Sequence, residues 1–136
     1  MGPCKLMIVD DEKAIRDVLS ELIEVCLPDF KVVAEASNGL EAVARAQEVD
    51  PDVIIMDVRM PLMDGIQATR RIKQELGLRA VVVTSTSFSW SEIKESAFYA
   101  GADLHIQKPF DFERMESVLR EAWSIANAAV ERVISV

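Results

Sequence analysis

The chain has 136 residues, of which 50% are hydrophobic and 28% are charged, with only five glycines and five prolines. This composition is typical of one globular domain and excludes a disordered or fibrous chain. The net charge of −8 repels phosphate backbones, which argues against direct nucleic-acid binding by this domain. Since the sequence shows no signal peptide and no long apolar segment, we expect a cytoplasmic location without membrane association. Cys4 and Cys26 lie within or beside apolar runs, which favours buried free thiols in a reducing compartment.

Short runs of β-branched and apolar residues alternate with stretches of helical length and period. The predicted strands cover residues 5–9, 31–35, 53–57, 80–84 and 103–107. The predicted helices cover residues 12–27, 38–49, 64–76, 91–100 and 111 to about 132. Five strands alternating with five helices imply an α/β fold with a parallel sheet covered on both faces. We expect a doubly wound, flavodoxin-like sheet in the order 2-1-3-4-5.

Local signals place several helix ends and one helix face. Asp64 precedes Gly65 and a periodic segment, so it is read as the N-cap of the third helix rather than as a metal ligand. Gly101 follows "AFYA" as a helix C-cap. The first helix carries apolar residues at three- and four-residue intervals, which predicts a face packed on the sheet: Ile15, Val18, Leu19, Leu22, Ile23 and Cys26.

Acidic residues end two of the predicted strands. Asp10 and Asp11 follow the strand 5–9, and Asp57 ends the strand 53–57. In the predicted order these strands are neighbours, and ligands of such sheets lie beyond the carboxyl ends at this switch point. Like charges in close quarters repel unless something positive lies between them. A hard cation with oxygen ligands such as Mg²⁺ would meet that need.

Two further polar groups reach the same edge of the predicted sheet. The fourth strand ends in the hydroxyl run "TST" (residues 84–86), and the fifth ends in "QKPF" with Lys108. Carboxylates, a metal, a hydroxyl and a lysine together suit phosphoryl transfer, in which an aspartate can act as the nucleophile. Because the chain has no Gly-rich loop of the P-loop type, the phosphoryl group must come from a small donor or a partner protein.

These residues resemble those of the response-regulator receiver domains of two-component signalling. The resemblance rests on "VDDE", "MDVRMPLMDG", the hydroxyl after the fourth strand and "GADLHIQKPF", and it covers about residues 4–123. It implies that Asp57 accepts phosphate from a histidine kinase or a phosphotransfer protein. It also implies that Asp11 binds Mg²⁺ directly, that Asp10 does so mainly through water, and that Asp57 and the Arg59 carbonyl are further ligands. Lys108 would pair with the phosphoryl group.

Two positions of the motif need interpretation. Counting forward from Asp57 favours Ser85 as the switch hydroxyl, whereas counting back from Lys108 favours Thr86. We expect Ser85, with a one-residue insertion in the loop "TSFSWSE". The family has an aromatic residue three positions before the lysine, where this chain has His105, its only histidine. A rotameric switch and a packed or solvent-edge residue at the strand end remain alternative interpretations of His105.

The predicted receiver domain covers residues 1–124, and residues 125–136 extend the last helix or form a linker stub. Apolar positions up to about Ala122 suffice for a stripe that packs on the predicted sheet, and the apolar surface continues beyond it. The apolar positions of this helix are Met115, Val118, Leu119, Ala122, Trp123, Ile125, Ala126, Ala129, Val130 and Val133. An exposed apolar helix face usually marks an interface. A homodimer through the fourth helix, fifth strand and fifth helix is one interpretation, and a tail cut from a longer protein is the other.

The sequence therefore predicts a signalling phosphoacceptor that takes part in its own phosphorylation and dephosphorylation but is not otherwise an enzyme. The alternative is an interaction module with the same fold that is not phosphorylated, against which the full set of acids and Lys108 argues. A hydrolase of the aspartyl-phosphate type is disfavoured. Such enzymes place a second Asp two residues after the nucleophile. In this chain Arg59 lies two residues after Asp57, and Glu12 lies two residues after Asp10.

Overall fold

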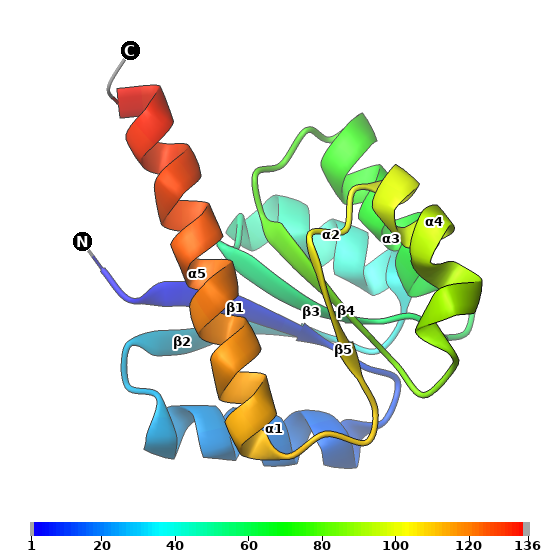
Figure 1. Cartoon of the computed structure of the whole chain (residues 1–136), viewed down its shortest axis with the longest axis horizontal. Coiled ribbons are helices and arrows are strands. Elements are labelled where there is room, and N and C mark those ends of the chain that lie inside the picture. Colours follow the sequence, from blue (N-terminus) through cyan, green and yellow to red (C-terminus); the bar gives the residue numbers. More distant parts are fainter. Residues whose placement is uncertain (1, 135–136) are drawn as a thin grey trace.

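A five-stranded parallel sheet forms the centre of the structure (Figure 1). The computed structural model describes residues 2–134, and it describes the side chains of residues 2–129. The strand order is β2-β1-β3-β4-β5, which confirms the predicted flavodoxin-like topology. The strands are β1 (Cys4–Val9), β2 (Phe30–Ala36), β3 (Val53–Asp57), β4 (Val81–Thr86) and β5 (Leu104–Gln107).

Helices cover both faces of the sheet (Figure 1). The helices are α1 (Lys13–Cys26), α2 (Gly39–Val49), α3 (Gly65–Arg70), α4 (Trp90–Ala100) and α5 (Phe112–Ile134), and a π-helical turn, η1 (Arg71–Glu75), continues α3. Buried residues of α1 and α5 share one hydrophobic cluster, and those of α2, α3 and η1 share another. Within residues 2–134, no helix is both long and apolar enough to cross a membrane.

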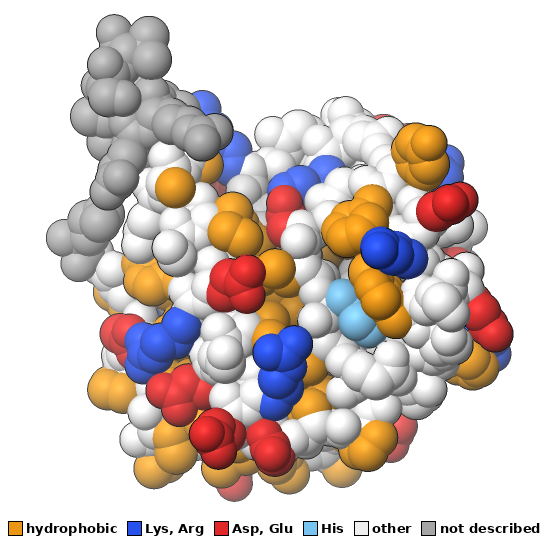
Figure 2. Space-filling view, viewed as in Figure 1, with side chains coloured by type: hydrophobic (Ala, Val, Ile, Leu, Met, Phe, Trp, Pro, Cys, Tyr) orange, Lys and Arg blue, Asp and Glu red, His pale blue; other side chains and the backbone are white. Residues whose placement is uncertain are grey.

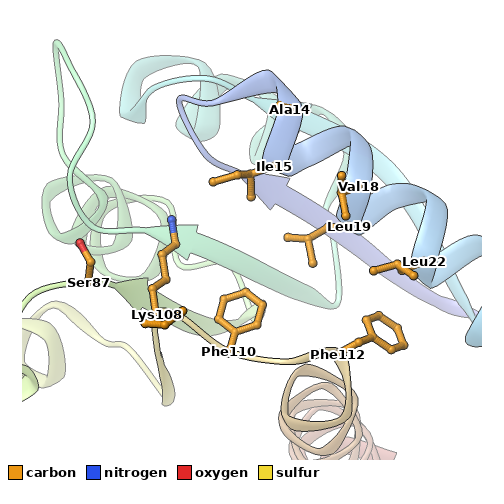
Figure 3. A pocket seen from close by; sticks show the side chains of 10 residues that line it. Ala14, Ile15, Val18, Leu19, Leu22, Ser87, Lys108, Phe110 and Phe112 are labelled. Carbon is orange, nitrogen blue, oxygen red and sulfur yellow. The ribbon is translucent and has the colours of Figure 1, made fainter.

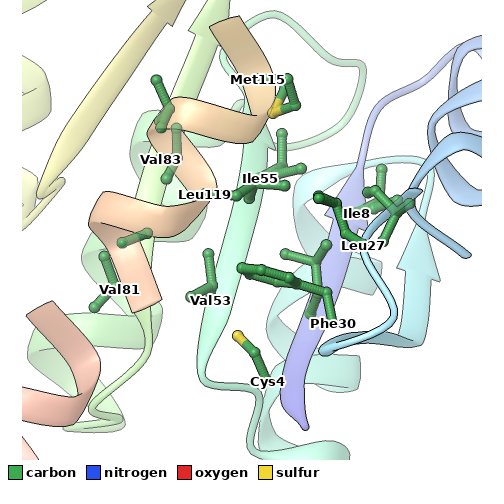
Figure 4. Close-up of a cluster of buried hydrophobic side chains, with 14 of the residues drawn as sticks. Cys4, Ile8, Leu27, Phe30, Val53, Ile55, Val81, Val83, Met115 and Leu119 are labelled. Atoms are coloured by element: carbon green, nitrogen blue, oxygen red, sulfur yellow. The ribbon is translucent and has the colours of Figure 1, made fainter. Parts of the chain in front are cut away.

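Alternate residues of the strands supply the two clusters. Leu6 and Ile8 of β1 face α1 and α5, whereas Met7 and Val9 face α2 and α3. Side chains of successive strand residues point to opposite faces, so a strand buried on both sides needs a continuous apolar run. Figure 4 shows the first cluster, in which Met115 and Leu119 of α5 lie over the strands.

Two predicted helix caps are confirmed. The Asp64 carboxylate accepts a hydrogen bond from the Gln67 N–H at 2.8 Å, and the Gln67 side chain accepts one from the Asp64 N–H at 3.1 Å. This reciprocal capping box occupies two backbone donors that a helix N-terminus otherwise leaves free. Gly101 ends α4 with a φ of 111°, a conformation that glycine adopts at little cost.

The face of α1 is less buried than its periodicity predicts. Leu19 and Ile23 are the buried residues of α1, whereas Val18 is 56% exposed and Leu22 is 36% exposed. Cys26 is exposed rather than buried as expected, although Cys4 is buried. The reason is that α1 turns only part of its apolar stripe toward the sheet.

The uncovered part of this stripe lines a groove of about 620 Å³ between α1 and the segment that joins β5 to α5. Figure 3 shows Ile15 and Leu19 on the α1 side of this groove and Phe110 and Phe112 on the other.

Helix α5 continues past the predicted domain boundary at residue 124. Ala126 is buried in the same cluster as Met115 and Leu119, and Ile125 is 37% exposed. Packing against the sheet therefore reaches one turn further than Ala122. Val130 and Val133 of the predicted apolar stripe, and residues 135 and 136, lie outside the part of the chain whose side chains are described.

The backbone after β3 approaches α3 so closely that one position excludes any side chain. The Gly65 N–H donates to the Val58 carbonyl at 2.8 Å, and a Cβ on Gly65 would lie 2.0 Å from the Asp57 carbonyl oxygen. Because the clash is with backbone, a larger residue can be accommodated only if α3 or the end of β3 moves. Gly65 thus sets the position of the loop that follows Asp57.

We expect Gly65→Ala to lower the free energy of unfolding by on the order of 1–3 kcal/mol, because the added methyl group overpacks a rigid contact. Gly77→Ala is the matched control. Its φ is +64° and a Cβ there meets nothing within 4 Å, so only backbone strain of about 1 kcal/mol applies. Urea unfolding followed by circular dichroism measures both. Equal stability of Gly65→Ala and the wild type would contradict the close approach.

Candidate functional site

The parallel pairing of β1 with β3 brings two buried aspartates to one edge of the sheet. Val9 pairs with Met56 in the register of these strands, so Asp10 and Asp57 follow at the same level. Asp10 is 4% exposed and Asp57 is 7% exposed. The third predicted carboxylate, Asp11, is exposed. The strand ends thus meet where the topology predicts, with two acids buried and one open to solvent.

Lys108 contacts both buried aspartates. Its Nζ lies 2.9 Å from Asp10 Oδ2 and 3.5 Å from Asp57 Oδ1. The repulsion between these carboxylates is therefore offset in part by a side chain that arrives from the end of β5. The sequence predicted Lys108 at this edge as the partner of a phosphoryl group. It predicted that a metal ion, rather than Lys108, would offset the repulsion between the acids. In the structure the lysine itself supplies positive charge between the acids.

A group of carboxylates at the end of β1 could hold a metal ion. It comprises Asp10, Asp11 and Glu12, which each offer a ligand oxygen within 4.8 Å of the others. Carboxylate oxygens suit a hard cation. Glu12 was not predicted as a ligand, although it is part of the "VDDE" motif. Asp57 is not a member of this group and is linked to it through Lys108.

Both carboxylate oxygens of Asp10 already accept hydrogen bonds. Oδ1 accepts from the Glu12 N–H at 2.9 Å, and Oδ2 accepts from Lys108 Nζ at 2.9 Å. A carboxylate has about four lone-pair sites, so each oxygen can still accept another donor. The carboxylate of Asp11, by contrast, belongs to an exposed residue.

Burial raises the pKa of Asp57 from its ordinary 3.8 to about 6. The charge of Lys108 opposes this shift, and the charges of Asp10 and Asp11 add to it. The sequence predicted repulsion among the clustered acids, but burial is the larger cause of the raised pKa of Asp57. For Lys108, burial alone would lower the pKa, but the hydrogen bond to Asp10 and the charge of Asp57 outweigh burial and raise it.

The two candidate switch hydroxyls lie in different surroundings. β4 extends to Thr86, two residues beyond its predicted end, and Ser85 pairs with Asp57 in the β3–β4 register. Paired residues of parallel strands point to the same face, so Ser85 shares the face of Asp57. Its Oγ is buried without a hydrogen-bond partner among the described residues. Thr86 Oγ1 accepts a hydrogen bond from the Phe88 N–H at 3.1 Å.

His105 packs against α4 on the other side of β5. Its ring stacks on Trp90 with the ring centroids 3.9 Å apart and the planes 9° apart, and its Nδ1 lies 3.2 Å from Thr84 Oγ1. Figure 2 shows the single histidine among hydrophobic side chains on this face. Burial lowers the pKa of His105, which favours the neutral ring. Trp90 is the first residue of α4, whereas the sequence predicted that this helix begins at residue 91.

A contact between Arg59 and Phe88 joins the loops after β3 and β4. The sequence did not predict this contact. The guanidinium carbon of Arg59 lies 3.6 Å from the centroid of the Phe88 ring, a cation–π geometry. The sequence singled out Arg59 only for its backbone carbonyl, because the side chain has no spacing signal that would pair it with Phe88. Phe88 lies in the loop after β4, for which a one-residue insertion is predicted.

Comparisons with known proteins agree on one family. A family model described as "Response regulator receiver domain" matches residues 6–120. Chemotaxis protein CheY of Halobacterium salinarum is 42% identical over 106 residues, which are 78% of this chain and 85% of that protein.

Solved structures give the same result. The response regulator domain of Thermotoga maritima CheB has a TM-score of 0.80 and 33% identity, covering 92% of this chain and 97% of that one. A CheX-CheY-BeF3-Mg+2 complex from Borrelia burgdorferi has a TM-score of 0.78 and 26% identity, covering 91% and 90%.

We expect Asp57→Asn to stabilise the metal-free protein at pH 7.5 by on the order of 1–3 kcal/mol. The folded-state pKa is raised to about 6, so the folded state holds the proton more tightly than the unfolded chain. Ionisation of Asp57 therefore opposes folding, and its cost grows from about pH 4 to pH 6 and stays constant above. The gain from Asp57→Asn should shrink toward zero at pH 4.

Urea unfolding in EDTA at pH 4, 6 and 7.5 tests this dependence. Asp17→Asn removes a charge from an exposed aspartate of α1 and should show no such gain. A stabilisation by Asp57→Asn that is equal at all three pH values would contradict the raised pKa.

Proposed function

Because the chain belongs to the family of response regulator receiver domains, we propose that it is a phosphoacceptor of two-component signalling in the cytoplasm, and that Asp57 is the residue phosphorylated. The observation that carries the proposal is the shared contact of Lys108 with Asp10 and Asp57, two buried carboxylates at the switch point of the sheet. Such a cluster is unfavourable for folding, and this suits a site retained for its chemistry.

The proposed reaction uses Asp57 as a nucleophile. One carboxylate oxygen attacks the phosphorus of a phosphohistidine or a small acyl phosphate, an acyl phosphate forms on Asp57, and the bond from phosphorus to the donor nitrogen or oxygen breaks. With a pKa of about 6, Asp57 is mostly ionised at pH 7.5 and able to attack. Lys108 lies within reach and is proposed to pair with an oxygen of the transferred group, as a compact positive charge can.

We further propose that Asp10, Asp11, Asp57 and the Arg59 carbonyl hold Mg²⁺. The donor set fits this ion because it consists of oxygen atoms, from carboxylates at the ends of β1 and β3 and from one backbone carbonyl in the loop after β3. When bound, Mg²⁺ neutralises charge that develops on the phosphoryl oxygens. Both oxygens of Asp10 already accept hydrogen bonds, which supports binding through water by Asp10 and direct binding by the exposed Asp11.

The proposed output is a change in a surface formed by α4, β5 and α5. His105 of β5 contacts both Thr84 of β4 and Trp90 of α4. A shift at the end of β4 would therefore move His105 and, through it, α4. Phosphorylation switches act by biasing such a two-state element. We also propose a homodimer through this surface. The proposed receiver unit comprises residues 1–124, with an extension at residues 125–136.

The partners are proposed to be a histidine kinase or a phosphotransfer protein that presents the phosphohistidine. One solved structure from Borrelia burgdorferi is a CheX-CheY-BeF3-Mg+2 complex, which supports the proposal that this kind of domain binds a partner protein. The alternative function is an interaction module with this fold that is never phosphorylated.

Incubation with acetyl phosphate and Mg²⁺ should add one phosphoryl group to the wild type, as measured by intact mass. Asp57→Asn should take up none, because an amide cannot form the acyl phosphate, and EDTA should abolish uptake by the wild type. Asp17→Asn keeps the site and should behave as the wild type. Uptake by Asp57→Asn at the wild-type rate would reject the assignment, whereas no uptake from acetyl phosphate or any phosphohistidine donor would favour the interaction module.

Ser85→Ala should slow phosphorylation of Asp57 by roughly 10- to 100-fold, since it removes a hydroxyl that we propose hydrogen-bonds the transferred group. Thr86→Ala is the matched control, because Thr86 Oγ1 is already engaged by the Phe88 N–H, and it should slow the reaction less than threefold on the same reasoning. Single-turnover rates with acetyl phosphate measure both. The reverse order of effects would assign the switch to Thr86.

A further inference from the structure

Arg16 joins the acidic end of β1 to the neighbouring strand. It lies on α1, and its side chain is only 13% exposed. Its Nη1 donates a hydrogen bond to the backbone carbonyl of Asp10 at 2.5 Å, and its Nε donates to Glu35 Oε1 at 3.1 Å. These two hydrogen bonds use the fixed fork geometry of the guanidinium, which restricts the orientation of the side chain.

The carbonyl that Arg16 contacts belongs to the peptide that joins Asp10 to Asp11. The other side of Asp10 is held by β2, since the Asp10 N–H donates to the Ala36 carbonyl at 3.1 Å. Without a donor at its carbonyl, this peptide could rotate, which would turn the Asp11 side chain and shift the Glu12 N–H that donates to the Asp10 carboxylate. The Asp10 carboxylate contacts Lys108, and together with Asp11 and Glu12 it forms the candidate metal-binding group.

We infer that Arg16 is a positioning residue for the site of the divalent cation. Arg16 holds the Asp10–Asp11 peptide so that both carboxylates stay directed at the site. Glu35 orients Arg16 from β2 and offsets its charge. The inference rests on the proposed function, because it takes these acids to hold Mg²⁺. Residues that orient metal ligands in this way typically contribute 10- to 100-fold to metal affinity.

The sign of the effect separates this role from simple electrostatics. A positive charge near the acids repels Mg²⁺, so the charge of Arg16 by itself weakens cation binding. Removing that charge should therefore tighten binding if Arg16 acts only through its field. Removing the hydrogen bond to the Asp10 carbonyl should weaken binding if Arg16 holds the ligands in place. The two interpretations predict opposite changes in the same measurement.

The chain offers a matched control in Lys13. This residue lies on the first turn of the same helix, pairs with Asp17 at 2.8 Å and has a side chain that is 76% exposed. Lys13→Met removes one positive charge from the same end of α1 but leaves the hydrogen bond to the Asp10 carbonyl intact. Arg16→Met keeps an apolar stem in place of the arginine and removes both of its hydrogen bonds.

Isothermal titration of Mg²⁺ at pH 7.5 measures the dissociation constant for the wild type, Arg16→Met, Arg16→Lys and Lys13→Met. Circular dichroism in EDTA gives the folded fraction by which each titration is normalised. We expect the dissociation constant of Arg16→Met to rise about tenfold, and that of Lys13→Met to stay equal or fall. Arg16→Lys should lie between Arg16→Met and the wild type, because an ammonium can donate to the carbonyl without the fixed fork.

An unchanged or tighter dissociation constant for Arg16→Met would overturn the inference and leave the proposed function standing. A purely structural role would lower the folded fraction of Arg16→Met without changing the affinity of the folded part, and this would overturn it too. If Arg16→Met does not fold, Arg16→Lys decides: affinity equal to the wild type rejects positioning by the fork. Absence of Mg²⁺ binding by the wild type would overturn the proposed function and this inference with it.

Discussion

The contact of Lys108 with Asp10 and Asp57 is the interaction on which the site depends. It joins the ends of three strands, β5, β1 and β3, that are far apart in the sequence. Two carboxylates buried side by side would repel each other strongly if no positive charge lay between them. The strand order β2-β1-β3-β4-β5 makes the contact feasible, because it brings the carboxyl ends of all three strands to one edge of the sheet.

Burial and the charge of Lys108 have opposite effects on the pKa of Asp57. Burial raises the pKa of Asp57 to about 6 despite the nearby lysine, so the carboxylate is ionised near neutral pH but remains poorly solvated. A buried carboxylate whose pKa is raised by desolvation and by neighbouring charges is typical of a functional site. The backbone that carries these acids makes two close contacts: Gly65 approaches the Asp57 carbonyl, and Arg16 donates a hydrogen bond to the Asp10 carbonyl.

Two apolar surfaces flank the site on opposite sides. One is the groove between α1 and the segment after β5, which Ile15, Leu19, Phe110 and Phe112 line. The other surrounds the stack of His105 on Trp90, where Phe98 packs edge-on against Trp90 with centroids 5.6 Å apart. Lys108 lines the first surface, and β5 carries His105 of the second.

The sequence by itself determined the fold and the acids at its switch point. Alternating strand and helix patterns specify a doubly wound sheet, and the positions of Asp10, Asp11, Asp57 and Lys108 at strand ends follow from that pattern alone. Tertiary structure alone decided which groups touch: Lys108 pairs with two acids, Ser85 shares a face with Asp57, Trp90 stacks on His105, and Arg16 holds the Asp10 carbonyl. It also left Cys26 exposed. The physical reason is that periodicity reports the local face of each element, whereas these contacts depend on strand register and side-chain rotamers, which residues distant in the sequence set together.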